Sequence, residues 1–221
     1  MLIISAGAAA TSGKSPDNTL AEHLILARRG SPEAMVEVAK LLLEDRRWRN
    51  DDTLHSDAFG WALIAARLGH PEAATLTGSL YRSGTGVKQN FVKSGKWLWR
   101  ARQRQARGAD FELALFYQDE RNPVQDKAKA SYHLKAALNK KDPRACVLAA
   151  QQKIQRQIPT RETLKELTCA AEGGIIPAML ILATYYEKKS SPNALFKAEA
   201  WLKKAVAAGS STALERLYPL P

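Results

Sequence analysis

Apolar residues recur at helical spacing along nearly the whole chain. In Trp61–Gly69 and Trp201–Gly209 they fall at i, i+3 and i+4, so one stripe of each helix is buried and the other face is solvated. The sequence therefore predicts an all-α protein. The expected helices span 18–29, 32–45, 56–68, 71–82, 90–107, 109–119, 125–140, 142–156, 160–173, 175–188, 193–208 and 210–218.

These helices belong to an internal repeat. Gly30, Gly69, Gly174 and Gly209 are each followed four residues later by Ala, and segments starting at Gly108 and Lys141 are degenerate copies. The intervals of 39, 39, 33, 33 and 35 residues fit a helix–turn–helix unit. The glycine ends one helix in a left-handed cap, and a proline fits the first turn of the next. Trp61, Trp97 and Trp201 recur at one repeat position, which predicts packing between repeats.

Two units carry the fullest copies of the repeat. The first shows Gly69, Ala73, Gly78, Tyr81, Gly84-Thr-Gly-Val87, Lys96 and Trp97, and the second shows Ala178, Leu182, Tyr186, Ala198, Trp201, Lys204 and Ala205. These motifs resemble those of the Sel1-like repeat family, and the resemblance covers residues 18–218. It implies a right-handed α-solenoid of about five Sel1-like, tetratricopeptide-like helix–turn–helix repeats over 18–221.

Residues 1–17 precede the repeats, and two interpretations stay open for them. Met1–Ala10 is apolar, with Ala-x-Ala-type spacing at Ala6, Ala8 and Ala10, but no Lys or Arg precedes it. The segment is either a flexible tail or the remaining part of a secretory signal. A periplasmic or exported bacterial location is slightly favoured, with the cytoplasm as the alternative.

Gly13-Lys14-Ser15 lacks the first glycine and the strand that a phosphate-binding loop needs. No apolar stretch reaches the roughly 20 residues of a membrane span.

Charge is unevenly distributed. The chain has a formal net charge of +11 and a pI of about 9.7, which favours an acidic partner. Residues 82–107 contain no Asp or Glu, and on a helix Lys93, Lys96, Arg100, Arg104 and Arg107 would share one face. This segment is either a basic patch that binds an acidic partner or a solvated outer face of a helix longer than its siblings. The candidate patch comprises Arg82, Lys88, Lys93, Lys96, Trp99, Arg100, Arg104 and Arg107; Trp48 also lies outside the repeat pattern.

Residues for catalysis or metal binding do not converge in the sequence. The four histidines, His23, His55, His70 and His133, fall in different repeats, and no catalytic or metal-ligand motif is present. We therefore expect no enzyme activity, no metal and no cofactor.

Cys146 and Cys169 are the only cysteines. If 142–156 and 160–173 form an antiparallel hairpin, the two residues lie at the same height, so a disulfide is conceivable. The alternative is two small buried hydrophobic residues. Cysteine-rich members of the Sel1-like family pair the start of one helix with the end of the preceding one. Cys146 occupies the first of those positions, but the matching partner position is Ala137.

The leading functional hypothesis is a non-catalytic scaffold or adaptor that holds a protein partner, expected to be acidic, on its concave face. The resemblance adds one alternative, a bacterial immunity protein that neutralises a secreted toxin. Nucleic-acid binding through 82–107 is a less favoured alternative, because the basic residues are concentrated in one repeat instead of recurring in each. We expect the chain to be a monomer.

Overall fold

The computed structural model describes residues 16–44, 52–154, 161–189 and 191–218. Within these ranges it has twelve α-helices and no strand. The chain divides into two compact units, Met1–Ala106 and Arg107–Pro221, each of which we describe by itself. None of the described helices combines the length and the apolar character needed to cross a bilayer. Residues 1–15 of the predicted N-terminal segment, and Trp48, lie outside the described residues.

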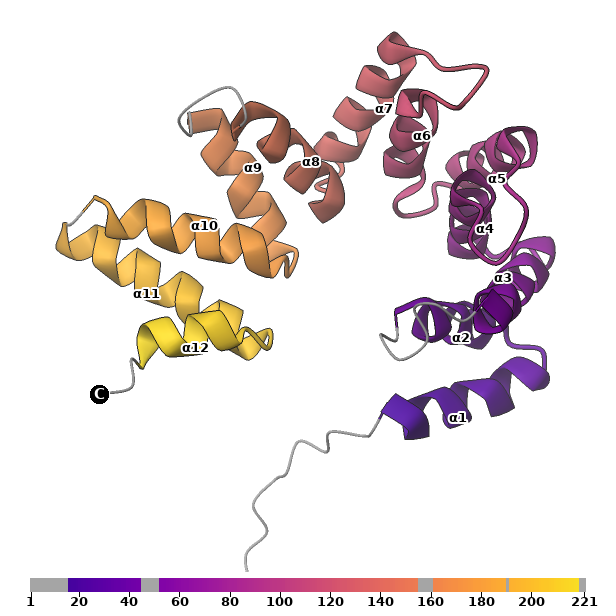
Figure 1. The fold of residues 1–221 in the computed structure, drawn as a ribbon, viewed down its shortest axis with the longest axis horizontal. Helices are drawn as coiled ribbons and strands as arrows, with labels where there is room; N and C mark the ends of the chain where they lie inside the picture. Colours follow the sequence, from indigo (N-terminus) through magenta and orange to yellow (C-terminus); the bar gives the residue numbers. More distant parts are fainter. Residues whose placement is uncertain (1–15, 45–51, 155–160, 190, 219–221) are drawn as a thin grey trace, which may run out of the picture. The chain divides into compact units, whose positions relative to one another are not determined.

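Both units are built from antiparallel helical hairpins (Figure 1). The first unit contains α1 (Pro16–Arg28), α2 (Pro32–Glu44), α3 (Asp52–Arg67), α4 (Pro71–Ser83) and α5 (Phe91–Gln103). The second contains α6 (Ala109–Gln118), α7 (Lys127–Asn139), α8 (Pro143–Ile154), α9 (Arg161–Glu172), α10 (Ile176–Glu187), α11 (Pro192–Ala207) and α12 (Ser211–Leu217). The hairpins are α2–α3, α4–α5, α6–α7, α8–α9 and α10–α11. The prediction of an all-α solenoid of about five helical hairpins is confirmed.

One turn recurs between successive hairpins. At the end of α3, the Gly69 N–H donates to the Ala66 carbonyl at 3.1 Å and the His70 N–H donates to the Ala65 carbonyl at 3.0 Å. Gly69 has a φ of 96°, so this is the left-handed Schellman cap. His70 is also the N-cap of α4, because its side chain accepts from the Ala73 N–H at 3.3 Å. Two consecutive residues therefore end one helix and start the next.

The same pair of backbone hydrogen bonds ends six helices in the described chain. Their left-handed residues are Gly30, Gly69, Gln105, Lys141, Gly174 and Gly209. The spacings are thus 39, 36, 36, 33 and 35 residues. Lys141 agrees with the predicted register. Gly108 does not, because Gln105 (φ 54°) caps α5 and Gly108 is the N-cap of α6.

The cap at Gln105 also corrects the length of α5. This helix ends at Gln103, one turn short of the predicted end at 107, and so it is no longer than its siblings. The unit boundary follows Ala106, in the two-residue extension between this cap and the start of α6. The boundary between the two units therefore lies where the repeat is irregular, between α5 and α6.

Small residues form much of the core. On α3, Ala58, Ala62, Ala65 and Ala66 are all buried, so the helices pack with little side chain between them. In the second unit the main cluster joins Leu167, Leu182 and Leu202 to buried alanines, with Trp201 packed at its edge. Burial of these side chains at roughly 25 cal/mol per Å² is what holds each helix in its hairpin.

The left-handed cap predicts opposite effects of glycine two residues apart. A side chain at left-handed φ costs about 1 kcal/mol, so Gln105→Gly should raise the free energy of unfolding by about that amount. Gln103→Gly, at the last helical position, should lower it by about 0.5 kcal/mol. Chemical denaturation of the two variants checks this; stabilisation by both, or by neither, would contradict the assigned register.

Candidate functional site

The α4–α5 hairpin carries a basic surface of the first unit, and the 84–90 turn fixes how α5 starts. Gly86 has a φ of 67°, and a Cβ there would collide with the His55 carbonyl of α3. The Asn90 N–H donates to the Tyr81 carbonyl at 2.8 Å, and the Asn90 side chain accepts from the Lys93 N–H at 2.9 Å. The Gly-x-Gly turn of the repeat motif thus lets this loop cross α3 closely and cap α5.

The inner side of α5 is locked onto α4. Ser94, Leu98 and Ala101 are fully buried. The Ser94 hydroxyl donates to the Gly78 carbonyl at 2.7 Å, and the Leu98 side chain lies directly over the Gly78 Cα. Gly78 therefore allows a close approach of the two helices, and this contact fixes which residues of α5 face solvent.

The outer side of α5 carries what we call the basic–aromatic face: Val92, Lys93, Lys96, Trp99 and Arg100. All five are exposed, with Val92 at 67% and Trp99 at 38%. Lys93 and Arg100 are two turns apart, so the cations span about 10 Å of helix. No carboxylate lies between residues 82 and 107. Among the described residues, these three cations make no ion pair.

Aromatic rings hold part of this face in place. Arg100 lies over the Trp97 ring at 5.0 Å and Lys93 over the Tyr81 ring at 5.4 Å. Arg102 lies over the Trp99 ring at 5.2 Å. Such contacts contribute about 0.5–1 kcal/mol at exposed sites and leave the charge accessible to a partner.

The structure separates the other predicted patch residues from this face. Arg82 is half-buried on α4, and Lys88 is exposed in the 84–90 turn. Arg104 is the C-cap of α5, and its guanidinium donates to the Gly69 carbonyl at the end of α3. Arg107 follows the unit boundary. The prediction that one helix face runs from Lys93 to Arg107 is therefore wrong beyond Arg100, because the helix ends at Gln103.

A buried polar network in the second unit was missed by the sequence analysis. Asp110 (4% exposed) accepts from Lys140 at 2.7 Å and lies 3.1 Å from Nδ1 of His133, which is 2% exposed. Glu112 accepts from Arg144 at 3.0 Å. Acidic residues inside the apolar run 109–117 were the available signal. The network ties α6 to α7 and α8.

The structure brings Cys146 and Cys169 together, with their Cα atoms 6.1 Å apart across the α8–α9 hairpin. Both residues lie at the same height of the hairpin and are joined in the structure. In the part of the chain that the structure describes, no group of three or more His, Cys, Asp or Glu side chains could hold a metal ion.

The Gly78–Leu98 contact predicts a matched pair of glycine substitutions. Gly78→Ala should lower the free energy of unfolding by about 2 kcal/mol, because the new Cβ would overlap the buried Leu98 side chain. Gly60→Ala meets no atom within 4 Å on α3 and should raise it by about 0.5–1 kcal/mol. Thermal and chemical denaturation measure both. Equal effects would mean that α4 and α5 do not approach at Gly78.

Several solved structures resemble this chain. A Sel1 repeat protein from Oxalobacter formigenes superposes with a TM-score of 0.62 at 24% identity, covering 93% of this chain and 60% of that protein. A sel1 repeat protein from Klebsiella pneumoniae superposes with a TM-score of 0.56 at 16% identity, and the match covers 89% of this chain and 96% of that protein. A Pseudomonas aeruginosa protein superposes with a TM-score of 0.56 at 17% identity, and the match covers 91% of this chain and 80% of that protein.

This chain thus spans about three fifths of the length of the Oxalobacter protein. No family model and no curated protein matches the sequence. The structural likeness concerns the fold, and it agrees with the repeat motifs read from the sequence. The chain therefore has the fold of the Sel1 repeat proteins.

Proposed function

We propose that this chain is a non-catalytic protein-binding module and that an acidic partner docks on the basic–aromatic face of α5. The observation that carries the proposal is this face itself: three exposed cations without ion-pair partners in the described chain, beside Trp99 and Val92, in a segment without any carboxylate. Arg and Trp are the residue types most enriched at binding hot spots.

The fold supports the same proposal. Stacked helical hairpins expose long rigid surfaces, and their helices hold side chains in fixed positions for a partner. Here Ser94, Leu98 and Ala101 fix the rotation of α5, so the cations point outward without any rearrangement. A preformed surface of this kind reduces the ordering cost of binding. The expectation that a partner lies on the concave face of the array stays a prediction.

Electrostatics defines the partner's chemistry. The chain is strongly basic overall, so it attracts acidic proteins and nucleic acid alike at long range. The aromatic and apolar members of the face add contact area that does not depend on salt. A specific acidic protein should therefore stay bound when salt is raised, whereas purely electrostatic ligands should be released.

Charge reversal on α5 should weaken partner capture. We expect the triple variant Lys93→Glu, Lys96→Glu, Arg100→Glu to retain an acidic partner from extracts at least tenfold more weakly than the unmodified chain, because three attractive contacts become repulsive. The control is Lys127→Glu, Lys135→Glu, Lys188→Glu, three exposed lysines of the second unit. Each triple lowers the net charge of +11 by six. Capture at low and high salt with a proteomic readout compares them.

Two outcomes would contradict the proposal. Equal loss of the partner by both triple variants would mean that only the net charge matters. Retention of nucleic acid, or of many acidic proteins that all leave at high salt, would mean that the face is a nonspecific cationic surface.

A further inference from the structure

The disulfide between α8 and α9 lines an open groove of the second unit. Cys146 lies in the first turn of α8 and Cys169 in the last turn of α9. The two sulfur environments differ, because Cys146 is 2% exposed and belongs to the core cluster, whereas Cys169 is half-buried at the edge of that cluster. Cys169 is therefore the more exposed residue of the pair.

The groove has a volume of about 520 Å³, enough for a small organic molecule. Leu138 and Leu164 line it together with the two cysteines, so part of its wall is apolar. Both cysteines line the groove, so a small molecule that enters it lies beside the disulfide-bonded residues.

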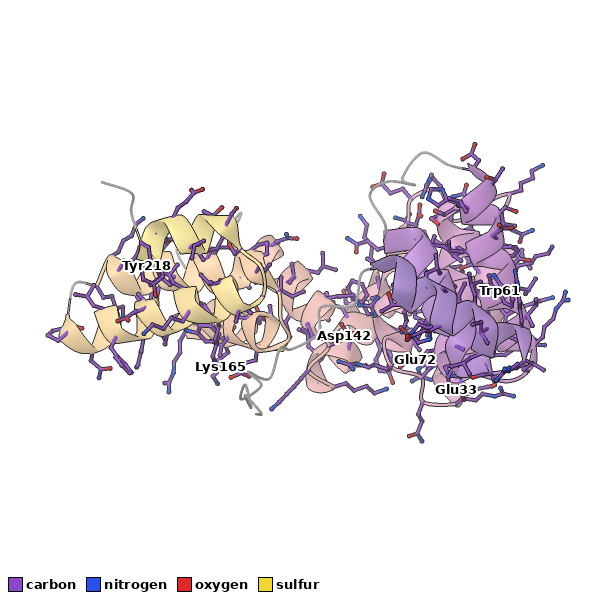
Figure 2. The ribbon with its side chains drawn as sticks, turned by 90° about the horizontal axis from the view of Figure 1, so that it is seen from below. Glu33, Trp61, Glu72, Asp142, Lys165 and Tyr218 are labelled. Carbon is purple, nitrogen blue, oxygen red and sulfur yellow. A yellow bond between two sulfur atoms is a disulfide. The ribbon has the colours of Figure 1, made fainter. Side chains whose placement is uncertain are left out.

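Charged residues surround this apolar part. Lys141, Arg161 and Lys165 line the groove, and Figure 2 marks Lys165 on the surface of this unit. Among the described residues, none of these three cationic side chains has a hydrogen-bond or ion-pair partner. Two carboxylates, Glu166 and Glu172, also line the groove, so its lining carries one more positive than negative side chain. Lys165 lies one turn before Cys169 on the same face of α9.

We infer that Cys169 is a modification site for low-molecular-weight thiols, with a preference for thiols that carry carboxylates. The thiolate of the small molecule attacks Sγ of Cys169. A new disulfide forms between the two, and the Cys146–Cys169 bond breaks. The electron pair leaves on Sγ of Cys146, which takes up a proton and remains as a buried thiol. The exchange needs no external oxidant, because one disulfide replaces another.

Accessibility decides which sulfur reacts. Thiol–disulfide exchange depends on which sulfur the incoming thiolate can reach, and Cys146 is covered by the core. Charge decides which thiol reacts fastest. The excess of one cation gives a modest, salt-sensitive preference for an anionic thiol over a cationic one, since exposed charges are screened within about 10 Å at 0.1 M salt.

The test uses the full chain, purified in air without reductant, and three probes: glutathione, 2-mercaptoethanol and cysteamine. Blocking with a maleimide before reduction should modify neither cysteine. After brief exposure to glutathione, acid quenching and maleimide treatment in denaturant, peptide mapping should place glutathione on Cys169 and maleimide on Cys146. The rate should rise linearly with thiol concentration, as direct attack requires.

At low salt, and corrected for thiolate fraction, glutathione should react about threefold faster than cysteamine, and the ratio should approach one at 0.5 M salt. Lys165→Gln should lower that ratio, whereas Lys188→Gln, outside the groove, should leave it unchanged. Three results would each overturn the inference. They are free thiols before reduction, glutathione on Cys146, and a rate that saturates with thiol concentration because unfolding limits the reaction. A ratio that Lys165→Gln does not change would overturn the charge preference.

Discussion

The left-handed residue at the end of every second helix is the constraint on which the rest of the structure depends. It reverses the chain through two backbone hydrogen bonds, and at every such cap except Gln105 the next residue is the N-cap of the following helix. Small side chains let neighbouring helices within a unit pack closely, as the buried alanines of α3 and the contact of α4 with α5 at Gly78 show.

The same constraint explains where the candidate interface lies. The cap at Gln105 ends α5 before Arg104, so the cations of the segment are divided between a helix face and a turn. Lys93, Lys96 and Arg100 remain free to meet a partner, whereas Arg104 donates to the preceding cap at Gly69. A continuous basic segment in the sequence thus yields one exposed basic–aromatic face and one structural contact.

Sequence reasoning predicted the helical hairpins well, because apolar periodicity, glycine and proline report directly on helices and their ends. It failed where tertiary packing overrides local preference. Gln105 has no intrinsic signal for a left-handed conformation, so the glycine at 108 was taken for the cap. α3 begins at Asp52, four residues before its expected start. The pairing of Asp110 with His133 was beyond reach, since 23 residues separate them and only the α6–α7 packing brings them together.

The central claim is that a protein partner contacts α5 itself. A photo-crosslinking amino acid placed at position 96, and in a control chain at exposed position 135 on α7, tests this in cells that produce the protein. The account predicts one acidic protein crosslinked from position 96 and absent from position 135. Crosslinking of that protein only from position 135, or of nucleic acid alone from position 96, would contradict it.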